Sequence, residues 1–125
     1  MKGKESKLLD SSAWLSYFFG ESKKIQAMVE SEQLLYTSVI SLFEIKRKFL
    51  MEGIKEGSAA LEFIKERSIV VELDEKIAEK AAAISVQKKL HAIDALIYAT
   101  AIDSNAVLIT GDRDFKGIDH VVVIK

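Results

Sequence analysis

The stretch that decides the fold is AIDALIYATAIDSNAVLITGDRDF, residues 92–115. Its first part, DALIYATA at 94–101, consists almost entirely of small or apolar residues, and a helix that is apolar around most of its surface is buried. The apolar strand AVLIT at 106–110 follows, and then the polar segment GDRDF. A buried helix that leads into a strand apolar on both faces is typical of a parallel sheet covered by helices.

The rest of the chain alternates in the same way on either side of this stretch. We expect strands at residues 8–9, 34–40, 69–73, 106–110 and 121–125. We expect helices at 11–20, 23–30, 41–51 and 55–66, and a long one from 74 that is interrupted near 90–93 and resumes at 94. This order predicts an α/β fold, with a mostly parallel central sheet of about five strands and helices on both faces. In such sheets ligands bind at the carboxyl ends of the strands, where the strand order reverses.

Length and composition exclude several classes of protein. The 125 residues are enough for one domain, which we place at 1–125. With 18 basic and 19 acidic side chains the net charge is −1. The protein as a whole therefore does not attract nucleic acid, and any contact with nucleic acid must use a local group of basic residues. The absence of cysteine excludes disulfides, thiolate zinc sites and thiol nucleophiles. The charged first residues and the lack of a long apolar run predict a cytoplasmic protein without a membrane anchor.

Four acidic residues each have an ordinary structural explanation. Asp10 follows the first strand and is placed to cap a helix. Glu44 follows Ser41 by three residues, in the pattern of a capping box. Asp94 stands where the buried helix is expected to begin, which is again a capping position, and Asp112 lies in a segment that favours a turn.

Their joint placement changes this interpretation. Asp10 and Asp112 follow strands, whereas Glu44 and Asp94 open helices. In a parallel sheet with covering helices, strand ends and helix starts lie on the same side. Four carboxylates gathered there repel one another unless cations neutralise them, and oxygen ligands favour hard ions such as Mg²⁺ or Mn²⁺. The sequence therefore predicts a metal site made of carboxylates.

Four segments of the chain together resemble the PIN-domain ribonucleases, a family that includes the toxins of many toxin–antitoxin pairs. These segments are LLDSSAWL (8–15), SVISLFEIKRK (38–48), AIDALIYATA (92–101) and LITGDRDF (108–115). Carried over position by position, the resemblance implies acidic metal ligands that are also the catalytic residues: Asp10, Glu44, Asp94 and Asp112. It also implies that the hydroxyls of Ser11 and Thr110 support this site. Asp114 stands where many members carry an acid, and it either binds metal or only shapes the turn.

The resemblance further implies an activity and partners. The activity is hydrolysis of RNA phosphodiester bonds by an endoribonuclease that uses one or two Mg²⁺ or Mn²⁺ ions and leaves a 5′-phosphate and a 3′-hydroxyl. The substrate is single-stranded or structured RNA, and the protein partners are a cognate antitoxin and a second copy of the chain. The residues expected to hold RNA are Lys46, Arg47, Lys48 and Arg113. The run at 46–48 is equally compatible with an ordinary solvated helix face.

Three other classes of protein compete with this hypothesis. A phosphoacceptor signalling domain needs a pair of acids after its first strand, but Asp10 is followed by Ser11 and Ser12. A haloacid-dehalogenase-like phosphatase needs an acid at position 12, which is serine. The remaining alternative is a non-catalytic RNA-binding or protein-docking module on the same fold. Four acids at one edge argue against it, because a module without catalysis gains nothing from holding carboxylates together.

Overall fold

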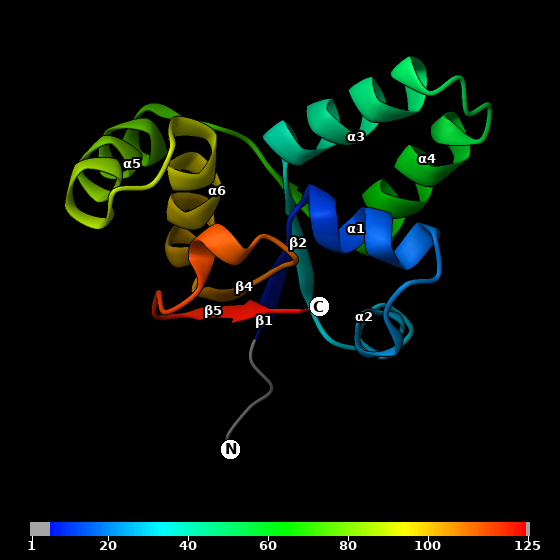
Figure 1. Cartoon of the computed structure of the whole chain (residues 1–125), viewed down its shortest axis with the longest axis horizontal. Coiled ribbons are helices and arrows are strands. Elements are labelled where there is room, and N and C mark those ends of the chain that lie inside the picture. Colours follow the sequence, from blue (N-terminus) through cyan, green and yellow to red (C-terminus); the bar gives the residue numbers. More distant parts are fainter. Residues whose placement is uncertain (1–5, 125) are drawn as a thin grey trace.

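The structure of the protein is a computed structural model that describes residues 6–124. Within this range five parallel strands form one sheet in the order β3-β2-β1-β4-β5 (Figure 1). The strands are β1 (Ser6–Leu9), β2 (Leu35–Ser38), β3 (Ile69–Val71), β4 (Ala106–Thr110) and β5 (Val121–Val123). The helices are α1 (Ser11–Phe18), α2 (Lys23–Val29), α3 (Val39–Met51), α4 (Gly57–Arg67), α5 (Glu75–Lys88) and α6 (Ala92–Asp103), with a short 3₁₀ helix, η1 (Arg113–Phe115). The predicted fold class is confirmed.

Helices cover both faces of the sheet, and alternate residues of the central strands point into two separate cores. Leu8 of β1 lies beside Leu108 of β4, and both pack against α5 and α6. The next pair in register, Leu9 and Ile109, packs on the opposite face against α1 to α4. Figure 1 shows this division, with α5 and α6 on one side of the strands and the other four helices on the other. No helix among residues 6–124 is long and apolar enough to span a membrane.

The start of α3 differs from the prediction. The helix begins at Val39 because the Ser38 hydroxyl accepts a hydrogen bond from the backbone N–H of Ile40 at 3.1 Å and so caps it. The predicted capping box between Ser41 and Glu44 is therefore wrong. Ser41 lies inside the helix, fully buried, and its hydroxyl has no partner within the described part of the chain.

The start of α6 also differs. Lys89 ends α5 in the left-handed conformation (φ 56°), and α6 begins at Ala92, two residues earlier than expected. Asp94 consequently lies within the first turn, and the expected capping role is wrong, because His91 occupies the cap position. Freed from capping, the Asp94 carboxylate is available for other contacts. At the other end of the chain, β5 stops at Val123 instead of 125, and Lys125 lies outside the described residues.

A buried chain of hydrogen bonds joins three elements on the α1–α4 side. The Trp14 indole Nε1 donates to Thr37 Oγ1 at 3.0 Å, and the hydroxyls of Thr37 and Ser68 lie 2.7 Å apart. Ser68 Oγ in turn donates to the carbonyl of Ile64 at 2.7 Å. With Ser68 donating to the carbonyl, the Thr37 hydroxyl donates to Ser68 and accepts from Trp14, so that each group is satisfied. The chain ties α1 and the end of α4 to β2.

Helix α4 holds its neighbours through two further contacts. A side chain at Gly57 would place its Cβ 2.8 Å from the Cβ of Phe49, so only glycine allows α4 to start this close to α3. At the other end of α4, Arg67 closes the connection between α2 and β2. Its guanidinium donates to the carbonyls of Val29 at 2.7 Å and of Ser31 and Gln33 at 3.0 Å each.

Because of this buried hydrogen-bond chain, we expect removal of a hydroxyl to lower the free energy of unfolding more at Thr37 than at Thr100. Thr37→Val keeps the shape of the side chain but leaves the Trp14 N–H without an acceptor, and we expect it to lower the free energy of unfolding by about 1–3 kcal/mol. Thr100→Val in α6 is the matched control, because Thr100 donates only to the Leu96 carbonyl of its own helix. The control is expected to stay within about 0.5 kcal/mol of the unmodified protein. Urea unfolding checks both values, and equal losses would contradict the prediction.

Candidate active site

The central strands β1 and β4 mark the point where the strand order reverses, and the acidic residues lie at their carboxyl ends. Asp10 directly follows β1, and Asp112 lies two residues beyond the end of β4. Glu44 comes from α3, which continues directly from β2. In Figure 1 the passages from β1 into α1 and from β2 into α3 lie close together near the centre of the view, and a direct hydrogen bond between α1 and α3 confirms their proximity. This is where ligands bind in folds of this type.

Asp10 is the buried centre of the arrangement, with only 8% of its surface exposed. Its Oδ1 accepts the backbone N–H of Ala13 at 2.9 Å and the hydroxyl of Ser12 at 2.7 Å. Its Oδ2 accepts the hydroxyl of Thr110 at 2.5 Å. Asp10 therefore caps α1, as its position in the sequence predicted, and it also bridges α1 to the end of β4.

The hydroxyls of Ser11 and Thr110, which were predicted to support the metal site, contact different carboxylates. Thr110 contacts Asp10 directly, and it also accepts the backbone N–H of Asp112 at 3.0 Å. Ser11 does not contact Asp10 but donates to Glu44 Oε1 at 3.0 Å, which orients that carboxylate.

Sequence reasoning missed Ser12. Its hydroxyl donates to Asp10 at 2.7 Å and accepts the backbone N–H of Gly111 at 2.8 Å. Ser12 thus joins the start of α1 to the turn after β4. The sequence did contain a signal for the contact with Asp10, because a hydroxyl two residues after a capping aspartate can donate a hydrogen bond to that carboxylate.

A second acidic group comes from the other side of the site. One carboxylate oxygen each of Asp94, Asp112 and Asp114 lies within 4.8 Å of the others. Asp112 caps η1 by accepting the backbone N–H of Asp114 at 2.9 Å, so that both acids of the turn stay beside α6. Asp10 and Glu44 fall outside this compact group.

Electrostatic effects connect the two sets of acids. Burial, together with the neighbouring charges of Asp112, Asp114 and Asp10, raises the pKa of Asp94 to about 6. Burial also raises the pKa of Asp10 despite its three hydrogen-bond donors, and Glu44 adds repulsion in the same direction. Both acids thus lie near others of like charge, which is the situation that a bound cation relieves.

The donor set fits a hard divalent cation. Carboxylate oxygens converge on one place, and hydroxyls hold two of the surrounding carboxylates in fixed orientations. Mg²⁺ and Mn²⁺ prefer oxygen ligands of this kind, whereas zinc and copper sites draw on histidine and cysteine. The residues best placed to hold such an ion directly are Asp94, Asp112 and Asp114.

The predicted basic residues differ in their availability to an external anion. Lys46 and Arg47 are exposed, and among residues 6–124 neither forms an ion pair. Lys48 pairs with Glu52 of its own helix at 2.8 Å, which neutralises part of its charge. Arg113 projects from η1 beside Ser12 and lines a hollow of about 400 Å³.

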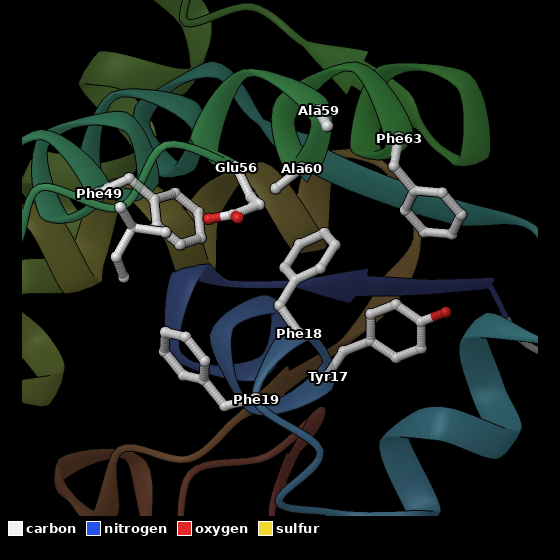
Figure 2. Close-up of a pocket in the computed structure, with 9 residues that line it drawn as sticks. Tyr17, Phe18, Phe19, Phe49, Glu56, Ala59, Ala60 and Phe63 are labelled. Carbon is white, nitrogen blue, oxygen red and sulfur yellow. The ribbon is translucent and has the colours of Figure 1, made fainter.

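A larger hollow of about 520 Å³ lies away from the acids, between α1 and the pair α3–α4 (Figure 2). Its walls are mostly aromatic, and the rings of Tyr17 and Phe63 stack with centroids 5.7 Å apart. Phe18, Phe19 and Phe49 add further rings to the apolar lining, and Glu56 contributes a carboxylate (Figure 2). We call it the aromatic groove. Helix α1 divides its aromatic rings between the core, where Trp14 is fully buried, and this groove.

Comparison with known proteins adds independent findings. The chain matches the PIN domain family over residues 7–121. It is similar to a chain of a toxin–antitoxin complex from Klebsiella pneumoniae, with 26% identity, a TM-score of 0.77 and coverage of 94% of this chain and 96% of that one. It shares the fold of a chain of the VapBC-1 complex from nontypeable Haemophilus influenzae, at 22% identity and a TM-score of 0.74 over 96% and 97% of the two chains.

A third similar structure is VapC20 of Mycobacterium tuberculosis, described as a toxin that cleaves the sarcin–ricin loop. It has 14% identity and a TM-score of 0.70 over 90% of this chain and 95% of that one. A search of curated proteins finds no match. The family match spans nearly the whole chain and includes all four predicted acids. The chain belongs to the PIN domain family.

Proposed function

We propose that this protein is a metal-dependent endoribonuclease that hydrolyses RNA, and that it is the toxin of a toxin–antitoxin pair. The observation that carries the proposal is the convergence of Asp94, Asp112 and Asp114 within 4.8 Å, beside the buried Asp10, at the strand-order reversal of a PIN fold. Membership of the PIN family supports nuclease activity in general. The similar Klebsiella and Mycobacterium proteins support toxin function and RNA as the substrate.

The residues of the chain have distinct roles in this proposal. Asp94, Asp112 and Asp114 hold Mg²⁺ or Mn²⁺, and Asp10 and Glu44 complete the acidic surroundings. Such an ion, when bound, lowers the pKa of water and neutralises charge on a phosphate. Thr110 and Ser12 hold the Asp10 carboxylate through short hydrogen bonds, so it needs no reorientation when substrate arrives.

Substrate binding falls to the cations around the acids. Lys46 and Arg47 on α3 and Arg113 on η1 are exposed, Arg47 lines a hollow together with Glu44, and Arg113 stands between Asp112 and Asp114 in the sequence. Their local charge compensates for a chain whose net charge is −1 and therefore has no general attraction for RNA. Lys48 contributes less, because its ammonium group is paired with Glu52. An RNA substrate inside the cell is in keeping with the predicted cytoplasmic location.

We infer that the aromatic groove receives the antitoxin. The Klebsiella and Haemophilus neighbours are themselves parts of toxin–antitoxin or VapBC complexes. The groove offers stacked aromatic walls and the carboxylate of Glu56, which suit an apolar peptide segment that carries one basic side chain. A homodimer remains a further prediction of the family resemblance.

The first prediction from this proposal concerns activity. Asp94→Asn changes one charge and almost no volume, so we expect it to reduce hydrolysis of a single-stranded RNA by at least about 100-fold without unfolding the protein. Asp103→Asn in the same helix is the matched control and is expected to keep full activity, since Asp103 pairs only with Lys76 and Lys80. EDTA should abolish hydrolysis, and Mn²⁺ should restore it. RNA binding without hydrolysis under all conditions would favour the non-catalytic module instead.

The second prediction concerns stability and pH. Because the pKa of Asp94 is raised to about 6 in the folded protein, the native state holds a proton that the unfolded chain has already released. The stabilising contribution of protonated Asp94 is therefore complete below about pH 4 and is lost as the pH rises toward 6. At pH 7.5 without metal, we expect Asp94→Asn to raise the free energy of unfolding by about 1 kcal/mol, a value discounted for partial exposure.

The same melting curves test the metal site. Divalent cation at 100 times its dissociation constant should stabilise the unmodified protein by about 2.7 kcal/mol, and Asp94→Asn should lose most of this response. Asp10→Ala should destabilise the protein by about 0.5–2 kcal/mol with or without metal, because Asp10 also caps α1. Absence of any shift at millimolar Mn²⁺ in the unmodified protein would count against the metal site.

The third prediction concerns the antitoxin. Co-expression with the open reading frame immediately upstream should yield a complex that co-purifies with the tagged chain. Phe63→Asp introduces a charge into the aromatic groove and should disrupt this complex. Val86→Asp provides the control, because Val86 is an 81% exposed residue of α5, outside the groove. If the complex still forms with Phe63→Asp, the antitoxin binds a surface other than the aromatic groove.

A further inference from the structure

A hollow of about 360 Å³ opens beside Glu44, and the roles proposed so far do not account for Phe43 in its lining. Ser11 and Glu44, joined by a 3.0 Å hydrogen bond, line one part of it. Phe43 and Arg47 of α3 also line it. Leu15, Met51 and the paired Lys48 and Glu52 complete the lining, so the hollow adjoins Glu44 and combines an apolar surface with one unpaired cation.

Phe43 is the unusual member of this lining. Its side chain is 65% exposed, although burying a phenylalanine contributes about 1.5–3 kcal/mol to a fold. The buried side of α3 is already formed by Ile45 and Phe49, so packing does not require an aromatic residue at position 43. A large exposed ring that the fold does not use, next to a candidate catalytic carboxylate, indicates a binding role.

Arg47 stands one helical turn beyond Phe43, a spacing at which two side chains lie on the same face of a helix. Its guanidinium makes no ion pair with any residue from 6 to 124, whereas the guanidinium of Arg67 is occupied by backbone carbonyls. The neighbouring Lys48 is held by Glu52 at 2.8 Å. Arg47 is thus available to an external anion.

We propose that Phe43 and Arg47 form a nucleotide subsite in which an unpaired base of single-stranded RNA stacks on the Phe43 ring and its phosphate contacts Arg47. Aromatic rings beside cations are the usual means of binding single strands, because every base has a stacking face. The subsite holds a nucleotide next to the one that is cleaved, since Phe43 directly precedes Glu44. This inference rests on the proposed ribonuclease function.

Lys48 and Glu52 in the lining neutralise each other, and the unpaired guanidinium of Arg47 favours RNA over a protein partner as the occupant of the hollow. Leu50, which lies outside the hollow near the end of α3 and is 68% exposed, is better suited to a contact between two copies of this chain. Phe43 instead shares its hollow with Arg47 and with a carboxylate held by Ser11. A polynucleotide passing the acids needs this combination of stacking surface and cation.

Kinetics on single-stranded RNA with Mn²⁺ test the proposal. Phe43→Ala should lower kcat/KM by about tenfold or more through KM, as expected for loss of one base–aromatic stack, while kcat changes little. Phe43→Trp should retain or improve kcat/KM. Leu50→Ala, which removes a similarly exposed apolar side chain from the same helix outside the hollow, should match the unmodified protein. Equal kcat/KM for Phe43→Ala and the unmodified protein would overturn the subsite.

Two further measurements distinguish base stacking from a contact between two copies of the chain. An abasic nucleotide moved along the RNA should weaken hydrolysis by the unmodified protein at one position and should have no added effect there in Phe43→Ala. Sedimentation should give the same oligomeric state for both proteins. A change from dimer to monomer in Phe43→Ala would overturn the proposal in favour of the contact between copies.

Binding of fluorescent RNA in EDTA keeps this inference distinct from the proposed catalytic function. If the unmodified protein binds RNA through Phe43 but never hydrolyses it, the subsite stands and the ribonuclease proposal fails. If the unmodified protein hydrolyses RNA and Asp94→Asn does not, while Phe43→Ala affects neither binding nor kcat/KM, only the subsite fails. Arg47→Ala should reduce the salt dependence of binding, whereas an unchanged salt slope would contradict its phosphate contact.

Discussion

The buried carboxylate of Asp10 is the constraint around which the site is built. A carboxylate with 8% exposure is costly unless donors surround it, and the chain supplies two hydroxyls and one backbone N–H. Thr110 stands at the end of β4, whereas Ser12 and Ala13 belong to α1. Satisfying this one side chain therefore fixes the start of α1 to the end of β4. Thr110 also accepts the N–H of Asp112, so the position of the second acidic group follows from the first.

The acids oppose the stability of the fold that carries them. Like charges and burial raise the pKa of both Asp94 and Asp10, which means that their ionised forms are less favourable in the native protein than in the unfolded chain. Functional sites commonly break local rules at the expense of stability, and the rest of the molecule compensates. The Trp14–Thr37–Ser68 hydrogen bonds and the carbonyl contacts of Arg67 are two buried or partly buried networks that hold the fold without involving these acids. Both are on the α1–α4 side, away from Asp94.

The sequence predicted most where hydrophobic patterning leaves few alternatives. Strand β4 was predicted with its observed bounds, because its apolar residues face cores on both sides. Helix starts were harder to predict. Ser38 and Ser41 both precede apolar residues, and only the contact of Ser38 with the N–H of Ile40 distinguishes the true cap. The bond of Ser12 to Asp10 is local and could be expected, but its contact with the N–H of Gly111 spans 99 residues and no local pattern reveals it. Whether Asp114 joins the compact acidic group likewise could not be predicted, because it depends on how η1 turns the backbone.

Helix α3 connects the two surfaces to which partners are assigned. Phe43 and Phe49 are six residues apart, about 120° around the helix axis, so one faces the hollow beside Glu44 and the other faces the aromatic groove. At Gly57 there is no space for even a methyl group against Phe49, so α3 and α4 have little freedom to slide past each other. A segment that wedges into the aromatic groove therefore presses on the helix that carries Glu44, without entering the acidic site. If the aromatic groove receives the antitoxin, as proposed, the bound segment contacts α3 through Phe49, and α3 is the helix that also carries Phe43 and Glu44.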